Sequence, residues 1–83
     1  ESVYQDAMVI ELELRHLKCQ REVFTPVTFR GRALRGHRLD LVVDERVLVE
    51  LKAVARLDAI HSSQVVSYLR ASGLRAGLLM NFN

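Results

Sequence analysis

Two short apolar segments near the middle of the chain, residues 38–43 (RLDLVV) and 48–52 (LVELK), decide how the sequence can fold. Both are rich in valine and leucine, and a polar stretch at 44–46 (DER) separates them, so we predict a β-hairpin whose centre is buried. Three charged residues interrupt the two segments: Asp40, Glu50 and Lys52. Because an unpaired charge is costly in a low-dielectric setting, we expect these residues to pair with each other, bind a metal or line a wet cleft.

The length of the hairpin loop decides whether these charged side chains meet. Side chains alternate between the faces of a strand, so Glu50 and Lys52 must point to the same face. A three-residue loop at 44–46 places Asp40 opposite Glu50, whereas a two-residue loop places Asp40 on the other face. Two opposed carboxylates repel each other unless a cation lies between them. The three-residue register therefore predicts half of a divalent-metal site.

Length and composition indicate a single globular domain that spans residues 1–83. The sequence is 49% hydrophobic and 27% charged, which excludes disorder as the default. Its formal net charge of +2 and isoelectric point near 9.1 permit a nucleic-acid partner without requiring one. Ten of its twelve basic residues are arginine, whose planar fork of donors binds phosphate well.

Cysteine content and hydropathy indicate where the protein works. Cys19 is the only cysteine, which excludes an intramolecular disulfide, a four-cysteine zinc site and a cysteine-held iron–sulfur cluster. We therefore expect a reducing, cytoplasmic location. No apolar run reaches membrane-spanning length and no signal-peptide pattern opens the sequence, so we expect no membrane partner. Because Glu1 already lies within a predicted helix, we expect the sequence to begin inside a longer chain.

The first part of the sequence predicts a helix followed by an extended segment. Residues 1–18 carry an apolar stripe at helical spacing, with Gln5 and Asp6 on the solvent side. The stripe consists of Val3, Ala7, Ile10, Leu14 and Leu17, and it is widened by Tyr4, Met8 and Leu12. Residues 22–29 are rich in β-forming residues but contain Pro26, which removes a ladder donor. We therefore predict an edge strand or a bent pair of strands there.

Positive charge is concentrated just before Asp40. We predict turns at Arg30-Gly31-Arg32 and at Arg35-Gly36. The arginines of this region are Arg30, Arg32, Arg35 and Arg38. Two interpretations remain open: these arginines steer a nucleic-acid backbone to a cleft, or they form a solvated hairpin tip.

The last part of the sequence predicts a helix and a strand. We expect a helix at 59–72, stopped by Gly73, and then an apolar strand at 74–82 buried on both faces. The strand–helix–strand connection makes the last strand parallel to one already in the sheet. The expected fold is α/β: a helix, two or three antiparallel strands, a helix and a strand, forming a mixed sheet flanked by helices.

One face of the second helix carries three polar residues: His61, Gln64 and Tyr68. His61 is a candidate to bind a phosphate, and a solvated surface histidine is the alternative. Spacing gives His16 and His37 no partner, so we assign them no role.

Four elements in this order resemble the PD-(D/E)XK nuclease superfamily. Asp40 followed by Glu50-Leu51-Lys52 resembles its Asp…Glu-x-Lys motif, and Gln64-x-x-x-Tyr68 resembles the Gln-x-x-x-Tyr element of its exonuclease-like branch. Glu1-x-x-Tyr4 and the helix after it resemble the opening of the small GxxExxY family, whose leading glycine would precede Glu1. The resemblance covers essentially the whole chain and implies a restriction-endonuclease-like core of a helix, three strands, a helix and a strand.

The resemblance implies a metal-dependent nuclease. Asp40 and Glu50 would hold Mg²⁺ or Mn²⁺ with the carbonyl of Leu51, since Mg²⁺ prefers hard oxygen ligands. By resemblance alone, Glu1 joins them from the first helix. Lys52 would orient the attacking water or stabilise charge on phosphorus.

Two further residues of the motif have assisting roles. Gln64 would hydrogen-bond the nucleophile or a ligand carboxylate, and Tyr68 would contact a phosphate. DNA is the expected substrate, with RNA as the alternative.

Three other interpretations belong to different classes. In the first, the charged residues are purely structural, and Lys52 forms an ion pair with Glu50 or Asp40. In the second, the domain is a catalytically silent nuclease-like fold that binds nucleic acid or a protein partner. Alternatively, it would be an assembly module that dimerises through its edge strand, against which Pro26 argues. For the nuclease, a homo-oligomer or a protein partner is expected to help grip a long polymer.

Overall fold

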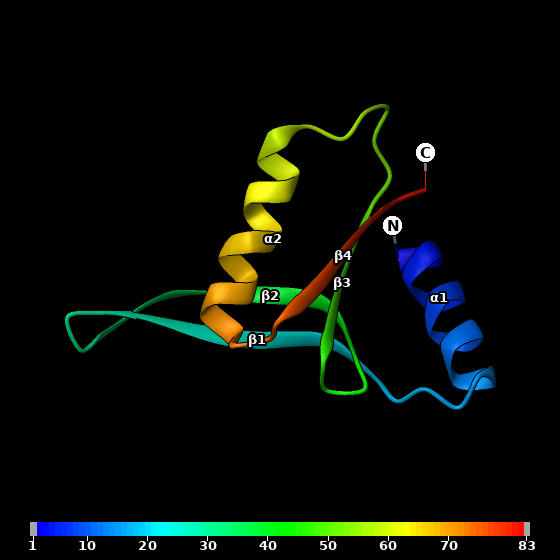
Figure 1. Cartoon of the computed structure of the whole chain (residues 1–83), viewed down its shortest axis with the longest axis horizontal. Helices are drawn as coiled ribbons and strands as arrows, with labels where there is room; N and C mark the ends of the chain where they lie inside the picture. Colours follow the sequence, from blue (N-terminus) through cyan, green and yellow to red (C-terminus); the bar gives the residue numbers. More distant parts are fainter. Residues whose placement is uncertain (1, 83) are drawn as a thin grey trace.

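The computed structural model describes residues 2–82 as two helices and a four-stranded sheet (Figure 1). The elements follow the predicted order of helix, three strands, helix and strand. Their bounds are α1 Ser2–Leu14, β1 Cys19–Phe29, β2 Arg32–Val43, β3 Val47–Lys52, α2 Ala59–Ser72 and β4 Ala76–Asn81. Within the described residues, no helix is long and apolar enough to cross a membrane.

The sheet is mixed, as the sequence predicts. Its strand order is β1-β2-β3-β4, with β2 antiparallel to both of its neighbours and β4 parallel to β3. Helix α2 forms the long crossover that parallel strands require. This arrangement confirms the predicted α/β class and restriction-endonuclease-like core.

The helices cover opposite faces of the sheet (Figure 1). The α1 face buries a cluster made of Val9, Leu41, Val43, Val49 and Leu51. The α2 face buries a second cluster made of Leu39, Val42, Leu48 and Val65. Leu39 and Leu41 would share a face in a regular strand, yet they belong to different clusters, so the alternation of β2 breaks at Asp40.

The neighbouring strand is also irregular at this point. The β1–β2 pairing skips Glu22 and Asp40, and Glu22 adopts the left-handed conformation with φ of 52°. Asp40 therefore occupies a local defect of the sheet, where its backbone is released from the regular ladder.

Helix α1 packs through one side of the predicted apolar stripe. Met8 and Leu12, which widen the stripe, contact the core together with Val9, whereas Val3 and Leu14 are each 72% exposed. The helix also ends at Leu14, not near residue 18. The stripe extends over both sides of this helix, so periodicity alone does not show which side is buried.

The β1–β2 hairpin also differs from the prediction. Only Arg30 and Gly31 form a turn, both with positive φ, while Arg35 and Gly36 lie within β2. Pairs Thr25–His37 and Val27–Leu34 leave two residues of β2 facing Pro26, which is a β-bulge. The bulge suits proline, which has no N–H to donate to the ladder. Strand β1 lies at the edge of the sheet, as expected.

The second half of the chain agrees with the prediction except for its last strand. Helix α2 ends before Gly73, whose φ of 80° is the left-handed cap conformation and whose N–H donates to the Leu69 carbonyl at 2.9 Å. Strand β4 was expected to be buried on both faces, but it forms the other sheet edge and contains no fully buried residue. Its apolar composition therefore does not reflect two-sided burial.

Candidate active site

The two acidic residues of the β2–β3 hairpin, Asp40 and Glu50, are joined by hydrogen bonds between side chain and backbone, and we call them the acidic pair. The N–H of Asp40 donates to Oε1 of Glu50 at 3.0 Å, and the N–H of Leu51 donates to Oδ2 of Asp40 at 3.0 Å. Val43 pairs with Val47 across the loop, so the loop has three residues and the two-residue alternative is wrong. Backbone pairing between β2 and β3 runs from Val43–Val47 to Leu41–Val49 and ends there. At Asp40 and Leu51, the two carboxylates accept the N–H groups that backbone carbonyls would accept in a regular ladder.

Glu50 is a buried acid next to a second acid. Glu50 is only 3% exposed to solvent. Burial raises the pKa of Glu50 to about 7, and the nearby Asp40 carboxylate also raises it. The hydrogen bond from the Asp40 N–H and the charge of Lys52 oppose this rise in pKa. Glu50 thus lies within electrostatic reach of both partners that the sequence predicts for it.

Oxygen donors converge where β2 and β3 separate. Besides the two carboxylates, the carbonyl of Leu51 faces β2, because N–H and C=O of one strand residue point to the same edge and the Leu51 N–H bonds Asp40. The next carbonyl, that of Lys52, points the other way and accepts from the Phe82 N–H at 2.8 Å. Hard oxygen donors of this kind fit a Mg²⁺ or Mn²⁺ ion. Glu1, the fourth predicted ligand, lies outside the described residues, within which no group of three metal-binding side chains occurs.

Lys52 ends β3 on the same strand face as Glu50. Its side chain is half-buried. Across residues 2–82, no carboxylate forms an ion pair with Lys52 within 4.0 Å. The ammonium group is therefore close enough to lower the pKa of Glu50 but is not locked into the structural ion pair considered above.

Helix α2 brings Tyr68 to the acidic pair. Burial raises the pKa of Tyr68, and the charges of Glu50 and Asp40 raise it further. Gln64 lies one turn earlier on the helix and is half-buried. His61 is close to the start of the helix, where its Nδ1 accepts the N–H of Asp58 at 2.9 Å. This bond leaves Nε2 as the nitrogen of His61 that is available to a ligand.

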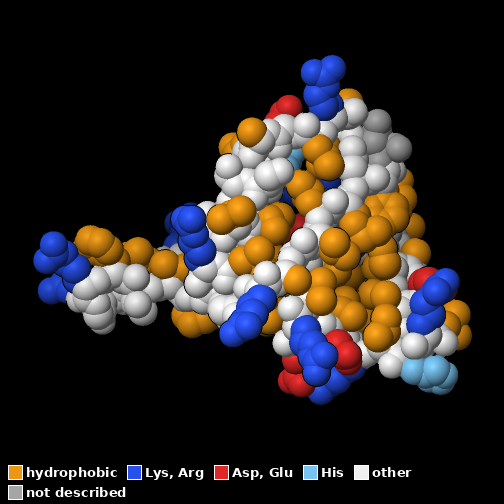
Figure 2. Space-filling view, in the orientation of Figure 1, with side chains coloured by type: hydrophobic (Ala, Val, Ile, Leu, Met, Phe, Trp, Pro, Cys, Tyr) orange, Lys and Arg blue, Asp and Glu red, His pale blue; other side chains and the backbone are white. Residues whose placement is uncertain are grey.

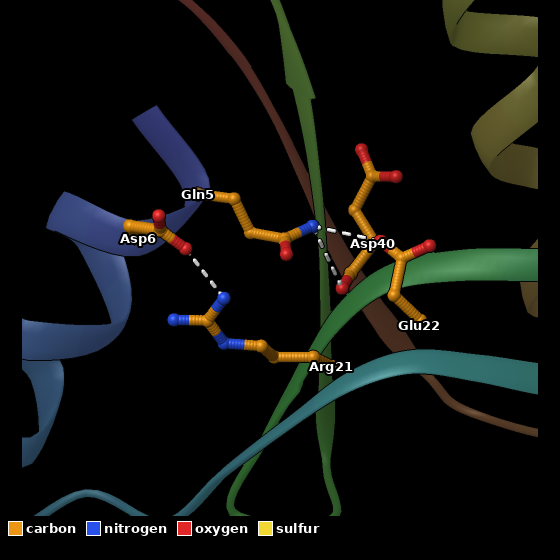
Figure 3. Close-up of polar contacts among 5 residues, drawn as sticks. All are labelled: Gln5, Asp6, Arg21, Glu22 and Asp40. Atoms are coloured by element: carbon orange, nitrogen blue, oxygen red, sulfur yellow. Dashed lines mark hydrogen bonds and ion pairs between the residues drawn. The ribbon is translucent and has the colours of Figure 1, made fainter. Parts of the chain in front are cut away.

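The structure adds two residues that sequence patterns did not single out. Gln5, expected on the solvent side of α1, is half-buried, and its amide Nε2 donates to Glu22 at 2.9 Å and to the Asp40 carbonyl at 3.5 Å (Figure 3). The ring of His37 lies 4.7 Å from the ring of Tyr68. Helical spacing could have predicted the position of Gln5, because this residue shares a helix face with Met8 and Leu12, and that face packs on the sheet.

The predicted arginines do not gather at the acidic pair. Arg30, Arg32 and Arg35 lie on the outer part of the β1–β2 hairpin. Arg38 is nearer, and its Nη1 is 3.9 Å from Glu22, the glutamate that Gln5 also binds. The structure thus brings together Asp40, Glu50, Lys52 and Tyr68, with Gln5 bonded to the Asp40 backbone and His37 beside Tyr68.

Comparisons with known proteins agree with this architecture. Searches of curated proteins and of solved structures each gave no match. A protein-family model described as the PD-(D/E)XK nuclease superfamily matches residues 1–83, which is the entire sequence. The match includes the strand that carries Asp40, the Glu50-Leu51-Lys52 segment and the helix that carries Gln64 and Tyr68. The chain therefore belongs to the PD-(D/E)XK nuclease superfamily.

Proposed function

We propose that the protein is a metal-dependent nuclease that hydrolyses phosphodiester bonds of nucleic acid, with DNA as its substrate, through Asp40, Glu50 and Lys52. The superfamily consists generally of nucleases that use divalent metal ions. The observation that carries the proposal is the buried Glu50 held beside Asp40, with its pKa raised to about 7. Strongly perturbed acids with a specific charged partner are typical of functional sites.

The acidic pair is built to receive a cation. Two neighbouring carboxylates without a cation repel each other, and burial of Glu50 increases this cost. Asp40, Glu50 and the Leu51 carbonyl would hold Mg²⁺ or Mn²⁺, with Glu1 as a further ligand. When bound, such an ion polarises the phosphoryl group and lowers the pKa of water.

The protein's own groups are fixed in place before a substrate arrives. The bonds from the Asp40 N–H to Glu50 and from the Leu51 N–H to Asp40 hold both carboxylates. Gln5 fixes the Asp40 backbone from α1 and acts as a positioning residue. Preorganisation of this kind removes part of the entropic cost of reaching the transition state.

The remaining residues act on the substrate and the nucleophile. The Lys52 ammonium orients the attacking water or stabilises the charge that develops on the phosphoryl oxygens. Because the pKa of Tyr68 is raised, its phenol stays protonated and can donate a hydrogen bond to a phosphate oxygen. Gln64 donates to the nucleophile or to a carboxylate, and His61 can donate to the nucleic-acid backbone through Nε2.

Within the superfamily we assign the chain to the GxxExxY family, on the basis of Glu1 and Tyr4. The Tyr4 ring stacks on Phe82 with centroids 4.9 Å apart, so this tyrosine anchors the start of α1 to the segment after β4. The lone Cys19 supports a reducing, cytoplasmic setting. We further infer that the domain of residues 1–83 acts as a homo-oligomer or with a protein partner, since a domain this small offers little surface to a long polymer.

Cleavage in the presence and absence of metal tests the proposed function. Labelled single- and double-stranded DNA and RNA would be incubated with the protein in Mg²⁺, in Mn²⁺ and in EDTA. We expect cleavage of DNA in both metals and none in EDTA, because the acidic pair cannot act on phosphate without a cation. Cleavage of RNA alone would correct the substrate class. Binding of nucleic acid without cleavage under any condition would favour the catalytically silent alternative and contradict the proposal.

A further inference from the structure

The β1–β2 hairpin reaches well beyond the rest of the molecule. Strand β2 pairs with β3 only through Leu41–Val43, so residues 32–40 pair with β1 alone or not at all. These nine residues span about 30 Å at about 3.3 Å a residue, and the inner end of this span still packs against α2 through His37 and Leu39. Figure 1 shows this two-stranded segment, which we call the arm (residues 24–38), projecting to the left of the body.

The outer part of the arm is uncovered on both faces. Every residue from Thr28 to Arg35 is exposed, although the strands remain paired as far as Phe29 and Arg32. A two-stranded ribbon without a third strand or a helix against it is marginally stable in water. Three large apolar side chains of the arm face solvent: Phe24 (62% exposed), Phe29 (61%) and Leu34 (53%). A partner would bury these side chains and stabilise the ribbon.

The charge of the arm identifies the kind of partner. The whole sequence has twelve basic and ten acidic residues, but the arm has four arginines and no acidic residue. The rest of the chain therefore has eight basic and ten acidic residues, a formal net charge of −2. Figure 2 shows basic and hydrophobic side chains on the arm, without acidic ones, on the face that is drawn.

Most of this positive charge is not neutralised within the protein. Of the four arm arginines, only Arg38 has a carboxylate within 4.0 Å among residues 2–82. Arg30 instead lies over the Phe29 ring, 5.6 Å from its centroid. The arm therefore carries arginines without an acidic partner, beside exposed aromatic and aliphatic groups, on a segment that protrudes from the body. These features match a polyanion with a concave surface.

Resting on the proposed nuclease function for its choice of ligand, we propose that the arm enters the major groove of duplex DNA. The groove is about 12 Å wide and admits a two-stranded β-ribbon. Arg30, Arg32 and Arg35 then contact the flanking phosphates, and the apolar side chains face the base edges. A single strand suits a stacking platform within a basic groove, and the arm is instead a protrusion.

The base of the arm connects to the acidic site. His37, on the arm, lies against Tyr68, whose phenol is within electrostatic reach of Glu50 and Asp40. Arg38 contacts Glu22, and Glu22 accepts from Gln5, which also binds the Asp40 backbone. A duplex bound by the arm therefore lies next to the residues proposed for catalysis.

Binding measured in EDTA, where no cleavage is expected, tests the arm apart from catalysis. Fluorescence anisotropy would compare wild-type protein with the triple variant Arg30→Ala, Arg32→Ala, Arg35→Ala on a labelled DNA duplex of about 20 base pairs. The matched control removes three exposed arginines outside the arm: Arg46→Ala, Arg70→Ala and Arg75→Ala. Far-ultraviolet circular dichroism confirms folding of each protein, and all six positions are exposed.

Three lost phosphate contacts predict a change in salt dependence. The slope of the logarithm of the DNA-association constant against the logarithm of salt concentration decreases in magnitude by about 0.9 for each lost contact. The arm variant should therefore have a slope smaller in magnitude by about 3 and should bind about 10²-fold more weakly at low salt. The control variant stays within threefold of wild type. Equal losses in the two variants would show that only overall charge matters and would overturn the proposal.

The form of the nucleic acid provides the second readout. Duplex RNA of the same length has a deep, narrow major groove that a ribbon cannot enter, so we expect at least tenfold weaker binding to it. Equal binding of duplex DNA and duplex RNA, or tighter binding of single-stranded DNA, would overturn groove insertion. Arm-dependent DNA binding by a protein that never cuts would contradict the proposed function but not the arm. Cleavage by a protein whose arm variants bind normally would contradict the arm alone.

Discussion

Lys52→Met is expected to lower the rate of single-turnover DNA cleavage by about 10³-fold in saturating Mg²⁺, within the range typical of a lost general acid–base or electrostatic group. Methionine keeps most of the length and apolar stem of the side chain but removes the ammonium group that lies near Glu50. Metal binding should persist, because the oxygen donors Asp40, Glu50 and Leu51 remain. Calorimetric titration with Mn²⁺ measures this second quantity independently of cleavage.

The only other lysine of the sequence supplies the control for this prediction. Lys18 is exposed and lies between α1 and β1, so Lys18→Met should cleave within about threefold of wild type. A Lys52→Met protein that cuts as fast as the Lys18→Met protein would remove Lys52 from the mechanism. Loss of Mn²⁺ binding in Lys52→Met would instead show that this lysine acts on the architecture of the site and not on the reaction.

Glu50→Gln is expected to abolish metal-dependent cleavage and yet to stabilise the metal-free fold at high pH. The folded pKa of Glu50 is about 7, raised mainly by burial from its ordinary value of 4.5. The folded protein therefore retains a proton that the unfolded chain has released. The resulting contribution to stability is fully present below about pH 4.5 and is lost as the pH rises through about 7.

Glutamine stays neutral throughout this range and can still accept the Asp40 N–H through its amide oxygen. The free energy of unfolding of Glu50→Gln, relative to wild type, should therefore rise by up to about 3 kcal/mol from low to high pH. Urea denaturation in EDTA at about pH 5, 6.5 and 8 measures it. Glu45→Gln, the same change on the exposed hairpin loop, is the control. If the difference in unfolding free energy between Glu50→Gln and wild type does not change with pH, the raised pKa of a buried Glu50 is contradicted.

The central hairpin shows why part of the site could be predicted. Two apolar runs and a polar loop sufficed to bring Asp40 next to Glu50 once the loop was taken as three residues. What the sequence did not reveal was the irregularity at Asp40. This irregularity coincides with the left-handed conformation of Glu22 on the neighbouring strand, for which no local residue signal exists.

Helix α1 and strand β4 show the limits of periodicity. Both elements were expected, but periodicity did not show which of the apolar residues in α1 are buried, and β4 is not buried on both faces. Helix α1 is apolar on two sides, and tertiary packing selected Met8, Val9 and Leu12 over Val3 and Leu14. This choice also brought Gln5 to the Asp40 backbone. Strand β4 is apolar yet lies at a sheet edge, so composition did not reveal its neighbours.

Gly36 illustrates a third kind of local ambiguity. An Arg-Gly pair is typical of turns, and a turn was expected there. In the structure, Gly36 lies in β2, where an added Cβ would come 2.5 Å from the Phe24 ring and 2.6 Å from the Thr25 carbonyl oxygen. The glycine thus serves close cross-strand packing beside the bulge, a requirement that depends on residues eleven and twelve positions earlier.

The proposed active site is tested most directly by cleavage of one labelled DNA duplex by wild-type protein and by Asp40→Asn, purified in parallel and assayed in Mg²⁺ and in EDTA. Asparagine can still accept the Leu51 N–H, so the fold should persist while the carboxylate is lost. Asp44→Asn, on the exposed hairpin loop, controls for the substitution and for contaminating nucleases. We predict product from wild type and Asp44→Asn in Mg²⁺ only, and none from Asp40→Asn. Equal, metal-dependent product from Asp40→Asn and wild type would contradict an active site at the β2–β3 acidic pair.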